Sequence, residues 1–187
     1  AFLTSDNLLN VANQIAVIAI LAVGMTLVII TGGIDLSVGS LIALGAVVTT
    51  LLIRNFAGAE QASALGMTGS ALAAILLCGG AGLVSGVMVT AFRIPPFIVT
   101  LGMMLVASGL AFLLSEGQSV YQVPDSFVWL GRGADLGGIP NAVLLTALLY
   151  AAAHVLTTRT ALGRSIYAVG SNPEAARLSG IPVWKVL

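Results

Sequence analysis

Few side chains in this sequence are of the types that carry acid–base, nucleophilic or metal chemistry. The 187 residues include seven acidic residues, seven basic residues, one histidine and one cysteine. Cys78 stands alone in an apolar run, and His154 has no second histidine, cysteine or carboxylate near it in sequence. A metal centre or a catalytic constellation needs several such groups brought together. The sequence therefore predicts neither a metal site nor catalytic residues.

The most informative polar residue is Asp35, which follows a pair of glycines between two apolar runs. The segment reads Thr31-Gly32-Gly33-Ile34-Asp35-Leu36-Ser37-Val38-Gly39-Ser40. Paired glycines relieve the φ constraint where a chain turns, and Asp35 or Ser37 can cap the next helix through a side-chain oxygen. One interpretation is a capped loop at a membrane surface. The other is a discontinuous helix facing a transport pathway, because a carboxylate near membrane depth is costly and usually functional.

Three amide side chains share one face of the first apolar run. Asn10, Asn13 and Gln14 follow an i, i+3, i+4 spacing, so all three point the same way on a helix. We expect this face to meet protein or water rather than lipid. Two interpretations remain open, hydrogen bonding between helices and a polar lining for an external vestibule.

The segment after the last apolar run carries a full set of helix signals. Asn172 is a good N-cap, Pro173 suits the first helical position, and the Glu174 carboxylate complements the positive helix end. Gly180 is a natural residue for the position after the C-cap, and Pro182 prevents the helix from continuing. The pattern predicts a two-turn helix over 173–179, too short to be stable alone in water.

The composition explains why so few reactive groups are present. Hydrophobic residues make up 58% of the chain, charged residues 7%, and the mean hydropathy is +1.09. A soluble domain carries about a quarter charged residues. The formal net charge is +0, so nothing attracts phosphate. The composition therefore argues against a soluble enzyme, a disordered chain and a nucleic-acid-binding protein, and it indicates a protein embedded in membrane lipid.

Five apolar runs meet or approach the length needed to cross a bilayer as a helix, which is about 20 residues. They cover residues 8–30, 36–53, 69–92, 96–115 and 139–157, and none contains an acidic or basic residue. Backbone groups in lipid must be satisfied within the segment, which favours helices. The predicted fold is an all-α polytopic transmembrane helix bundle forming one domain over 1–187, with a cytoplasmic segment over 158–187.

Charge places the ends of these spans. With five alternating spans, residues 31–35, 93–95 and 158–187 lie on one side of the membrane. That side holds Arg93, Arg159, Arg164, Arg177 and Lys185 against Asp35 and Glu174. The other side holds Arg54 and Arg132 against Asp6, Glu60, Glu116, Asp125 and Asp135. The positive-inside rule therefore places the first side in the cytoplasm.

Three segments together resemble a known family, the permease subunits of ATP-binding-cassette importers of the ribose, xylose and galactoside type. They are Ala22–Ser40, which contains the Gly-Gly-Ile-Asp sequence, Ile94–Met104, which contains the tandem prolines, and Leu162–Ile181. The resemblance covers nearly the whole chain. Family subunits have about ten spans in the bacterial inner membrane, so this chain is expected to be an interior portion of a longer permease.

The resemblance implies a role for each polar segment. It implies an ATPase-coupling helix formed by Asn172, Pro173, Glu174, Ala175, Ala176, Arg177, Leu178, Ser179 and Gly180. It also directs attention to a candidate inner translocation pathway shaped by Gly32, Gly33, Asp35, Ser37 and Gly39. The chain itself would bind no cofactor, in agreement with the absence of a G-x-x-x-x-G-K-[ST] motif. ATP would be used by a partner ATPase subunit.

The resemblance implies an assembly of two identical permease subunits on two ATPase subunits. A periplasmic sugar-binding protein would deliver a monosaccharide to it. Alternatives remain open at this point. One is a permease of the same superfamily for branched-chain amino acids or nucleosides. Another is an ion-coupled secondary transporter, which would use buried carboxylates to carry the coupling ion. The five runs contain no Asp, Glu, Lys or Arg, and His154 is their one histidine, which argues against this alternative.

Overall fold

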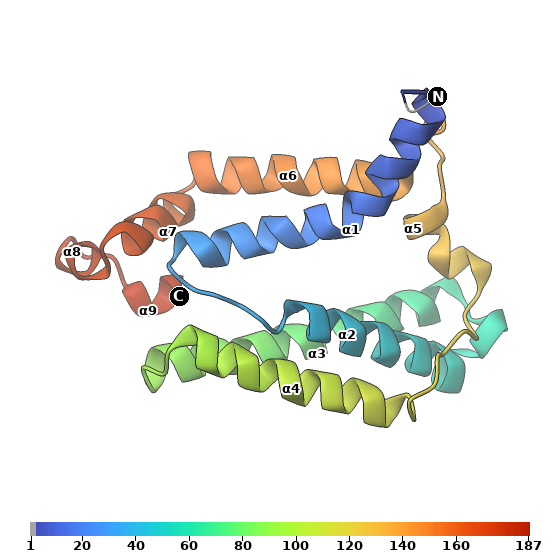
Figure 1. The fold of residues 1–187 in the computed structure, drawn as a ribbon, viewed down its shortest axis with the longest axis horizontal. Helices are drawn as coiled ribbons and strands as arrows, with labels where there is room; N and C mark the ends of the chain where they lie inside the picture. The colour runs from blue at the N-terminus through green and yellow to red at the C-terminus, as the bar shows by residue number, and fades with distance from the viewer. Residues whose placement is uncertain (1–2) are drawn as a thin grey trace. The chain divides into compact units, whose positions relative to one another are not determined.

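The computed structural model describes residues 3–187 and consists mainly of helices (Figure 1). Among the described residues, five helices are long and apolar enough to cross a membrane. They are α1 (Ser5–Ile30), α2 (Val38–Leu52) together with the π-helical turn that extends it to Ala57, α3 (Ala64–Ala91), α4 (Pro96–Leu114) and α6 (Asn141–Arg159). The predicted all-α fold with five spans is thus confirmed.

The largest shift in a predicted boundary is at the start of α3. The apolar run predicts a start near residue 69, whereas the helix begins at Ala64. The Ser63 hydroxyl accepts a hydrogen bond from the Gly66 N–H at 3.1 Å and so caps the extra turn. A cap of this kind lies outside the hydrophobic run, so hydropathy alone does not detect it. The α3–α4 turn matches expectation, with Pro96 at the first position of α4.

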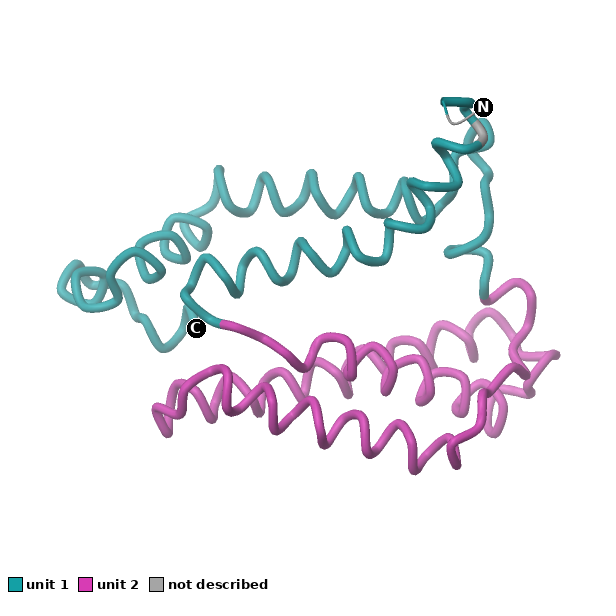
Figure 2. The backbone as a smooth tube through the Cα atoms, viewed as in Figure 1, with its two compact units in different colours: residues 1–33, 128–187 teal, residues 34–127 magenta. Residues whose placement is uncertain are grey.

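The chain divides into two compact units, coloured separately in Figure 2. The unit over residues 34–127 contains α2, α3 and α4, which pack on one another. Its core comprises Leu44, Ala107 and Ala111, with Leu41, Val47 and Val48 packed against them. Past Leu52, α2 continues as a π-helical turn (Ile53–Ala57) that ends at Gly58, where φ is +102°. The expectation of one domain over 1–187 stays a prediction.

The other unit combines residues 1–33 with residues 128–187. In it α1 and α6 lie side by side, and α6 leads into three shorter helices (Figure 1). These are α7 (Ala161–Ser171), α8 (Pro173–Leu178) and α9 (Val183–Val186). The loop before α6 is partly helical, with a 3₁₀ turn (Asp125–Val128) and α5 (Trp129–Arg132).

Helix α7 was not among the elements expected from the sequence. Its start is capped by Thr160, whose hydroxyl oxygen accepts a hydrogen bond from the Gly163 N–H at 3.0 Å. Its buried residues are Gly163, Ile166 and Val169, which recur every three residues. That spacing is the local signal of an amphipathic helix, and it was available in the sequence.

Candidate functional site

The break between α1 and α2 begins with a well-satisfied helix end. The Gly33 N–H donates to the Val28 carbonyl at 2.9 Å, and the Gly32 N–H donates to the Ile29 carbonyl at 3.0 Å. This pair of hydrogen bonds is the Schellman arrangement, which places a left-handed residue just after the C-cap. Gly32 is that residue, with φ of +80°. The glycine pair therefore ends α1 while leaving few of its terminal carbonyls without partners.

The two glycines are required for different physical reasons. At Gly32 the positive φ disfavours any other residue, although an added Cβ would meet nothing within 4 Å. At Gly33 an added Cβ would lie 3.0 Å from Val28 Cγ1 and 3.2 Å from the Val28 carbonyl oxygen. Gly32 is thus selected by backbone conformation and Gly33 by close packing against α1.

Beyond the glycines, Asp35 organises the entry to α2. Its Oδ1 accepts hydrogen bonds from the Ser37 N–H at 2.8 Å and the Ser37 hydroxyl at 2.6 Å. Ser37 occupies the N-cap position and is 1% exposed, but its side chain caps no helix amide. The expectation that a Ser37 side-chain oxygen caps α2 is therefore wrong. Because the Ser37 hydroxyl proton points to Asp35, the carboxylate satisfies the N-cap residue rather than an amide inside the helix.

The extended segment is also tied to α4. The Thr100 hydroxyl lies 3.1 Å from the Ile34 carbonyl oxygen and 2.9 Å from the Pro96 carbonyl oxygen. Thr100 is buried in the first turns of α4. This hydrogen bond gives the non-helical Ile34 carbonyl a protein partner. It also places Ile34 and the start of α4 at the same end of their unit, as the alternating spans predict.

The structure brings Gly32, Gly33, Asp35 and Ser37 into one short broken segment, and Gly39 follows in the first turn of α2. Gly39 is exposed, and an added Cβ there would meet nothing within 4 Å. Asp35 is half-buried. The segment is therefore a non-helical connection between α1 and α2, held by specific hydrogen bonds. Whether it lines a pathway stays a prediction.

The predicted helix over 173–179 is present as α8. Asn172 Oδ1 accepts hydrogen bonds from the Glu174 N–H at 3.1 Å and the Ala175 N–H at 3.0 Å. Pro173 occupies the first turn, and Gly180, with φ of +84°, follows the C-cap Ser179. The Gly180 and Ile181 amides close a second Schellman arrangement on the last turn. Each cap expected from the sequence is thus observed.

An ion pair lies on the exposed face of α8. Arg177 Nη2 donates to Glu174 Oε1 at 2.6 Å, and Arg177 Nε donates to Glu174 Oε2 at 3.1 Å. The Arg177 hydrogen bonds and positive charge lower the pKa of Glu174 below its ordinary value. The same contacts raise the pKa of Arg177. Exposed pairs of this kind stabilise a protein little. Because both side chains are exposed, both charges are accessible from outside the unit.

Burial separates the two faces of α8. Ala176 is 4% exposed, while Leu178 on the other side is 78% exposed. Helix α8 packs on α7 and α9 within its unit. A two-turn helix is thus held by its neighbours and leaves Glu174, Arg177 and Leu178 accessible. This surface is suited to contact with another protein.

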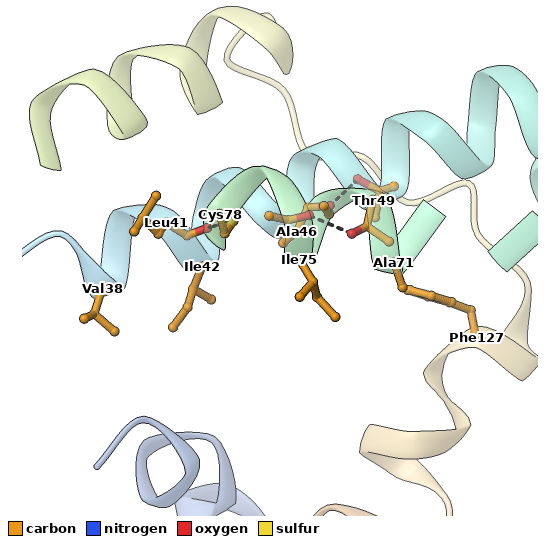
Figure 3. A pocket seen from close by; sticks show the side chains of 12 residues that line it. Val38, Leu41, Ile42, Ala46, Thr49, Ala71, Ile75, Cys78 and Phe127 are labelled. Carbon is orange, nitrogen blue, oxygen red and sulfur yellow. Dashed lines mark hydrogen bonds between the residues drawn. The ribbon is translucent and has the colours of Figure 1, made fainter. Parts of the chain in front are cut away.

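A wide apolar groove lies between α2 and α3 (Figure 3). It encloses about 540 Å³ and is lined by Val38, Leu41, Ile42, Gly45, Ala46, Thr49, Thr50, Ala71, Ala74, Ile75, Cys78 and Phe127. Its few polar atoms are already engaged, because the Thr49 hydroxyl donates to the Gly45 carbonyl and the Cys78 thiol to the Leu41 carbonyl. The groove therefore offers no set of groups that would pair with sugar hydroxyls.

A smaller cavity of about 190 Å³ lies among α1, α6 and α7. Its polar lining comprises Thr26, Tyr150, His154, Thr157 and Tyr167. The Thr26 and Thr157 hydroxyl protons are used on carbonyls of their own helices. His154 thus lines the same cavity as two tyrosines, Tyr150 and Tyr167.

The amide face of α1 is divided by burial. Asn10 and Gln14 are exposed, whereas Asn13 Oδ1 is buried and has no hydrogen-bond partner within the described part of the chain. A buried acceptor without a partner is unusual in a folded protein. Both interpretations of this face, hydrogen bonding to another helix and a vestibule lining, stay open.

Comparison with known proteins finds matches that cover nearly the full sequence. Residues 7–187 match the family described as branched-chain amino acid transport system / permease component. The chain is 43% identical over 193 residues to the ribose import permease protein of Escherichia coli (strain K12), a match that covers 99% of this chain and 56% of that protein.

Two further relatives carry other names. The L-arabinose ABC transporter permease protein of Azospirillum brasilense is 37% identical over 185 residues, covering 99% of this chain and 52% of that protein. The galactofuranose transporter permease protein of Escherichia coli (strain K12) is 41% identical over 176 residues, covering 92% of this chain and 48% of that protein. The chain spans about half the length of the curated relatives it matches. No solved structure matches it.

Proposed function

This chain belongs to the family of permease components that includes the sugar permeases of ATP-binding-cassette importers, and we propose that it forms part of the translocation pathway of such an importer for a monosaccharide. The observation that carries the proposal is the 43% identity to a ribose import permease over 99% of this chain. The five membrane-spanning helices and the resemblance drawn from three sequence segments support it.

In this proposal α8 is the ATPase-coupling helix. Three properties support the assignment. The helix is capped at both ends, it is held against α7, and it leaves Glu174, Arg177 and Leu178 exposed. A partner ATPase subunit would bind this surface and hydrolyse ATP. Closure of the ATPase subunits would displace α8 and switch the pathway between inward-facing and outward-facing states, a rigid-body transition.

The proposed inner pathway is the broken segment with Gly32, Gly33, Asp35, Ser37 and Gly39. Its support is the combination of irregular backbone and a half-buried carboxylate between two membrane-spanning helices. Transporters use helix breaks of this kind near their substrate and gating sites. Two copies of the permease in the bacterial inner membrane would enclose the pathway, and a periplasmic binding protein would deliver the sugar.

A second cargo is favoured by one observation. The matching family is described by branched-chain amino acid transport, while the three relatives compared above are named for sugars. Because the relatives match with high identity over nearly the whole chain, we rank a monosaccharide first. The binding protein that stimulates the complex would decide between the two cargoes.

The test uses the full-length parent permease, co-expressed with its ATPase subunit and reconstituted in lipid. We expect ATP turnover to rise when the binding protein is added with ribose or L-arabinose, and to stay at the basal rate with leucine. We also expect the rise to be lost in the Glu174→Arg variant. Folded subunits that neither associate nor show any stimulation would contradict the proposal. Uptake that stops when the proton gradient is collapsed, with ATP present, would instead indicate an ion-coupled transporter.

A further inference from the structure

We propose that the contact between Gly170 of α7 and the carbonyl of Ile30 transmits movement of α8 to the Gly32–Gly33 break. The inference rests on the proposed coupling role of α8 and names the path within the chain by which that role would reach the pathway. It is carried by three structural connections. They are the joint between α8 and α7, the fixed start of α7, and the close approach of α7 to α1.

The joint between α7 and α8 is a single residue bonded to both helices. Asn172 donates its backbone N–H to the Ala168 carbonyl of α7 at 3.1 Å. Its side-chain oxygen accepts the first two amides of α8, from Glu174 and Ala175. On either side of the joint, Val169 is 0% exposed and Ala176 is 4% exposed. A displacement of α8 therefore cannot be absorbed at the joint without breaking these contacts.

The start of α7 is fixed to the end of α6. The Thr160 hydroxyl donates to the Leu156 carbonyl at 2.6 Å and accepts from the Gly163 N–H at 3.0 Å. A Cβ added at Gly163 would lie 2.3 Å from the Leu156 carbonyl oxygen, so only glycine permits this approach. With its start held against α6, α7 responds to α8 at its other end, where Gly170 lies.

Gly170 meets the last residue of α1. A Cβ added at Gly170 would lie 1.8 Å from the Ile30 carbonyl oxygen and 2.8 Å from the Ile30 carbonyl carbon. Real Cβ atoms do not approach other atoms so closely, and both atoms met are backbone, so no rotamer change relieves the clash. Ile30 is followed within three residues by the left-handed Gly32 and the tightly packed Gly33. Non-helical residues next to a helix end are where hinge motion is normally absorbed.

These connections form one continuous path from α8 through Asn172 and α7 to Ile30 and the glycine pair. Every step lies within the unit formed by residues 1–33 and 128–187. Close-packed contacts of this kind transmit displacement because they have little free volume.

The test measures movement at the break in the full-length permease assembled with its ATPase subunit. The reference protein carries Cys78→Ser, which keeps a hydrogen-bond donor, and Ile34→Cys, at a position that is 52% exposed. The rate of maleimide labelling of Cys introduced at position 34 is compared without nucleotide and with ATP plus vanadate. We expect the reference rate to change at least threefold between the two conditions.

In the Gly170→Ala variant we expect the ATPase subunit still to co-purify, since the α8 caps are unchanged, while the labelling rate becomes nearly independent of nucleotide. Gly24→Ala is the matched control, because Gly24 lies in α1 and an added Cβ there meets nothing within 4 Å. The control should respond as the reference does. A full nucleotide response in an assembled Gly170→Ala complex would overturn the inference.

A second variant decides the matter if Gly170→Ala does not assemble. Val169→Ala adds no atoms and loosens the packing of α7, so it should reduce the nucleotide response by about half or more while retaining assembly. An unchanged response in this variant would also overturn the inference. Failure of the proposed function is distinguishable, because the reference protein would then bind no ATPase subunit and show no nucleotide response.

Discussion

Asp35 Oδ1 accepts two hydrogen bonds from one residue, Ser37, through its backbone N–H at 2.8 Å and its hydroxyl at 2.6 Å. The Ser37 carbonyl in turn accepts from the Ser40 hydroxyl at 2.7 Å and from the Leu41 N–H at 2.9 Å, the first hydrogen bonds of α2. The carboxylate therefore holds the residue whose carbonyl accepts the first hydrogen bonds of α2. Its role at the break is structural whether or not a substrate passes it.

Replacing Asp35 with alanine should destabilise the full-length protein by about 1–3 kcal/mol, because two Ser37 donors lose their acceptor and Ser37 is buried. Asp35→Asn is the matched variant, since its amide oxygen still accepts hydrogen bonds but carries no charge. We expect Asp35→Asn to lose less stability than Asp35→Ala. Thermal unfolding in detergent, followed by tryptophan fluorescence, measures both, and equal losses would mean that the hydrogen bonds contribute nothing.

The hydrogen bond from Thr100 to Ile34 is testable with an isosteric change. Thr100→Val removes a donor shared by the Ile34 and Pro96 carbonyls. Thr90→Val is the control, because the Thr90 hydroxyl bonds only the Gly86 carbonyl of its own helix. We expect Thr100→Val to destabilise by about 1 kcal/mol more than Thr90→Val. Equal unfolding temperatures for the two variants would argue against a tie between the broken segment and α4.

The two glycines of the break should tolerate substitution differently. Gly32→Ala places a side chain at φ of +80° and should cost about 1–2 kcal/mol through backbone strain. Gly33→Val crowds Val28 and should impair both stability and transport. Gly24→Ala, in open space within α1, should be neutral or slightly stabilising. Sugar uptake and unfolding temperature are measured for all three variants. Full activity of Gly33→Val would indicate that the segment is a loose surface loop.

The Asn172 cap is expected to control the first turn of α8. Asn172→Ala removes the acceptor of the Glu174 and Ala175 amides and should weaken the helix by about 1 kcal/mol. Asn172→Asp preserves the acceptor and should preserve the helix. Hydrogen exchange of these two amides in the full-length protein provides the measurement. Equal protection in the wild type and Asn172→Ala would show that packing on α7, not the cap, maintains the helix.

Reversing the charge at Glu174 tests the docking surface. Glu174→Arg replaces the negative charge beside Arg177 with a positive one. We expect ATPase association and stimulated ATP turnover to fall at least tenfold, while membrane insertion is unchanged. Glu174→Gln removes the ion pair without reversing the charge and should have a smaller effect, because the pair is exposed. Normal sugar uptake by Glu174→Arg would contradict the coupling role of α8.

The pH dependence of this ion pair has a defined sign. Arg177 lowers the pKa of Glu174 below its ordinary value of 4.5, so the carboxylate is ionised at neutral pH. Its small contribution is present above the unfolded-state pKa and is lost only as the pH falls through the lower folded-state pKa. As the pH falls through 4.5, infrared difference spectra against Glu174→Gln should show Glu174 protonating at lower pH in the wild type than in Arg177→Gln. Protonation at the same pH in both proteins would contradict the ion pair.

Much of this molecule follows from local sequence. The five membrane-spanning helices depend on length and hydropathy, which are properties of each segment by itself. The ends of α8 depend on Asn172, Pro173 and Gly180, whose capping groups lie within a few residues of the amides and carbonyls they satisfy. Helix α7 is also encoded locally, in the spacing of Ile166 and Val169 and in the Thr160 cap. Because it is less hydrophobic than the apolar runs, a search for membrane-spanning segments does not find it.

Other features were decided only by tertiary structure. The sequence indicated that the Gly32–Gly33 pair turns the chain, but not that Val28 crowds Gly33. The bond from Thr100 to Ile34 joins residues 66 positions apart, and the contact between Gly170 and Ile30 joins α7 to α1. Such contacts depend on which helix faces meet and at what height, and hydropathy carries no information about either. Local chemistry thus determined the helices and their ends, while packing decided which backbone atoms of different helices come into contact.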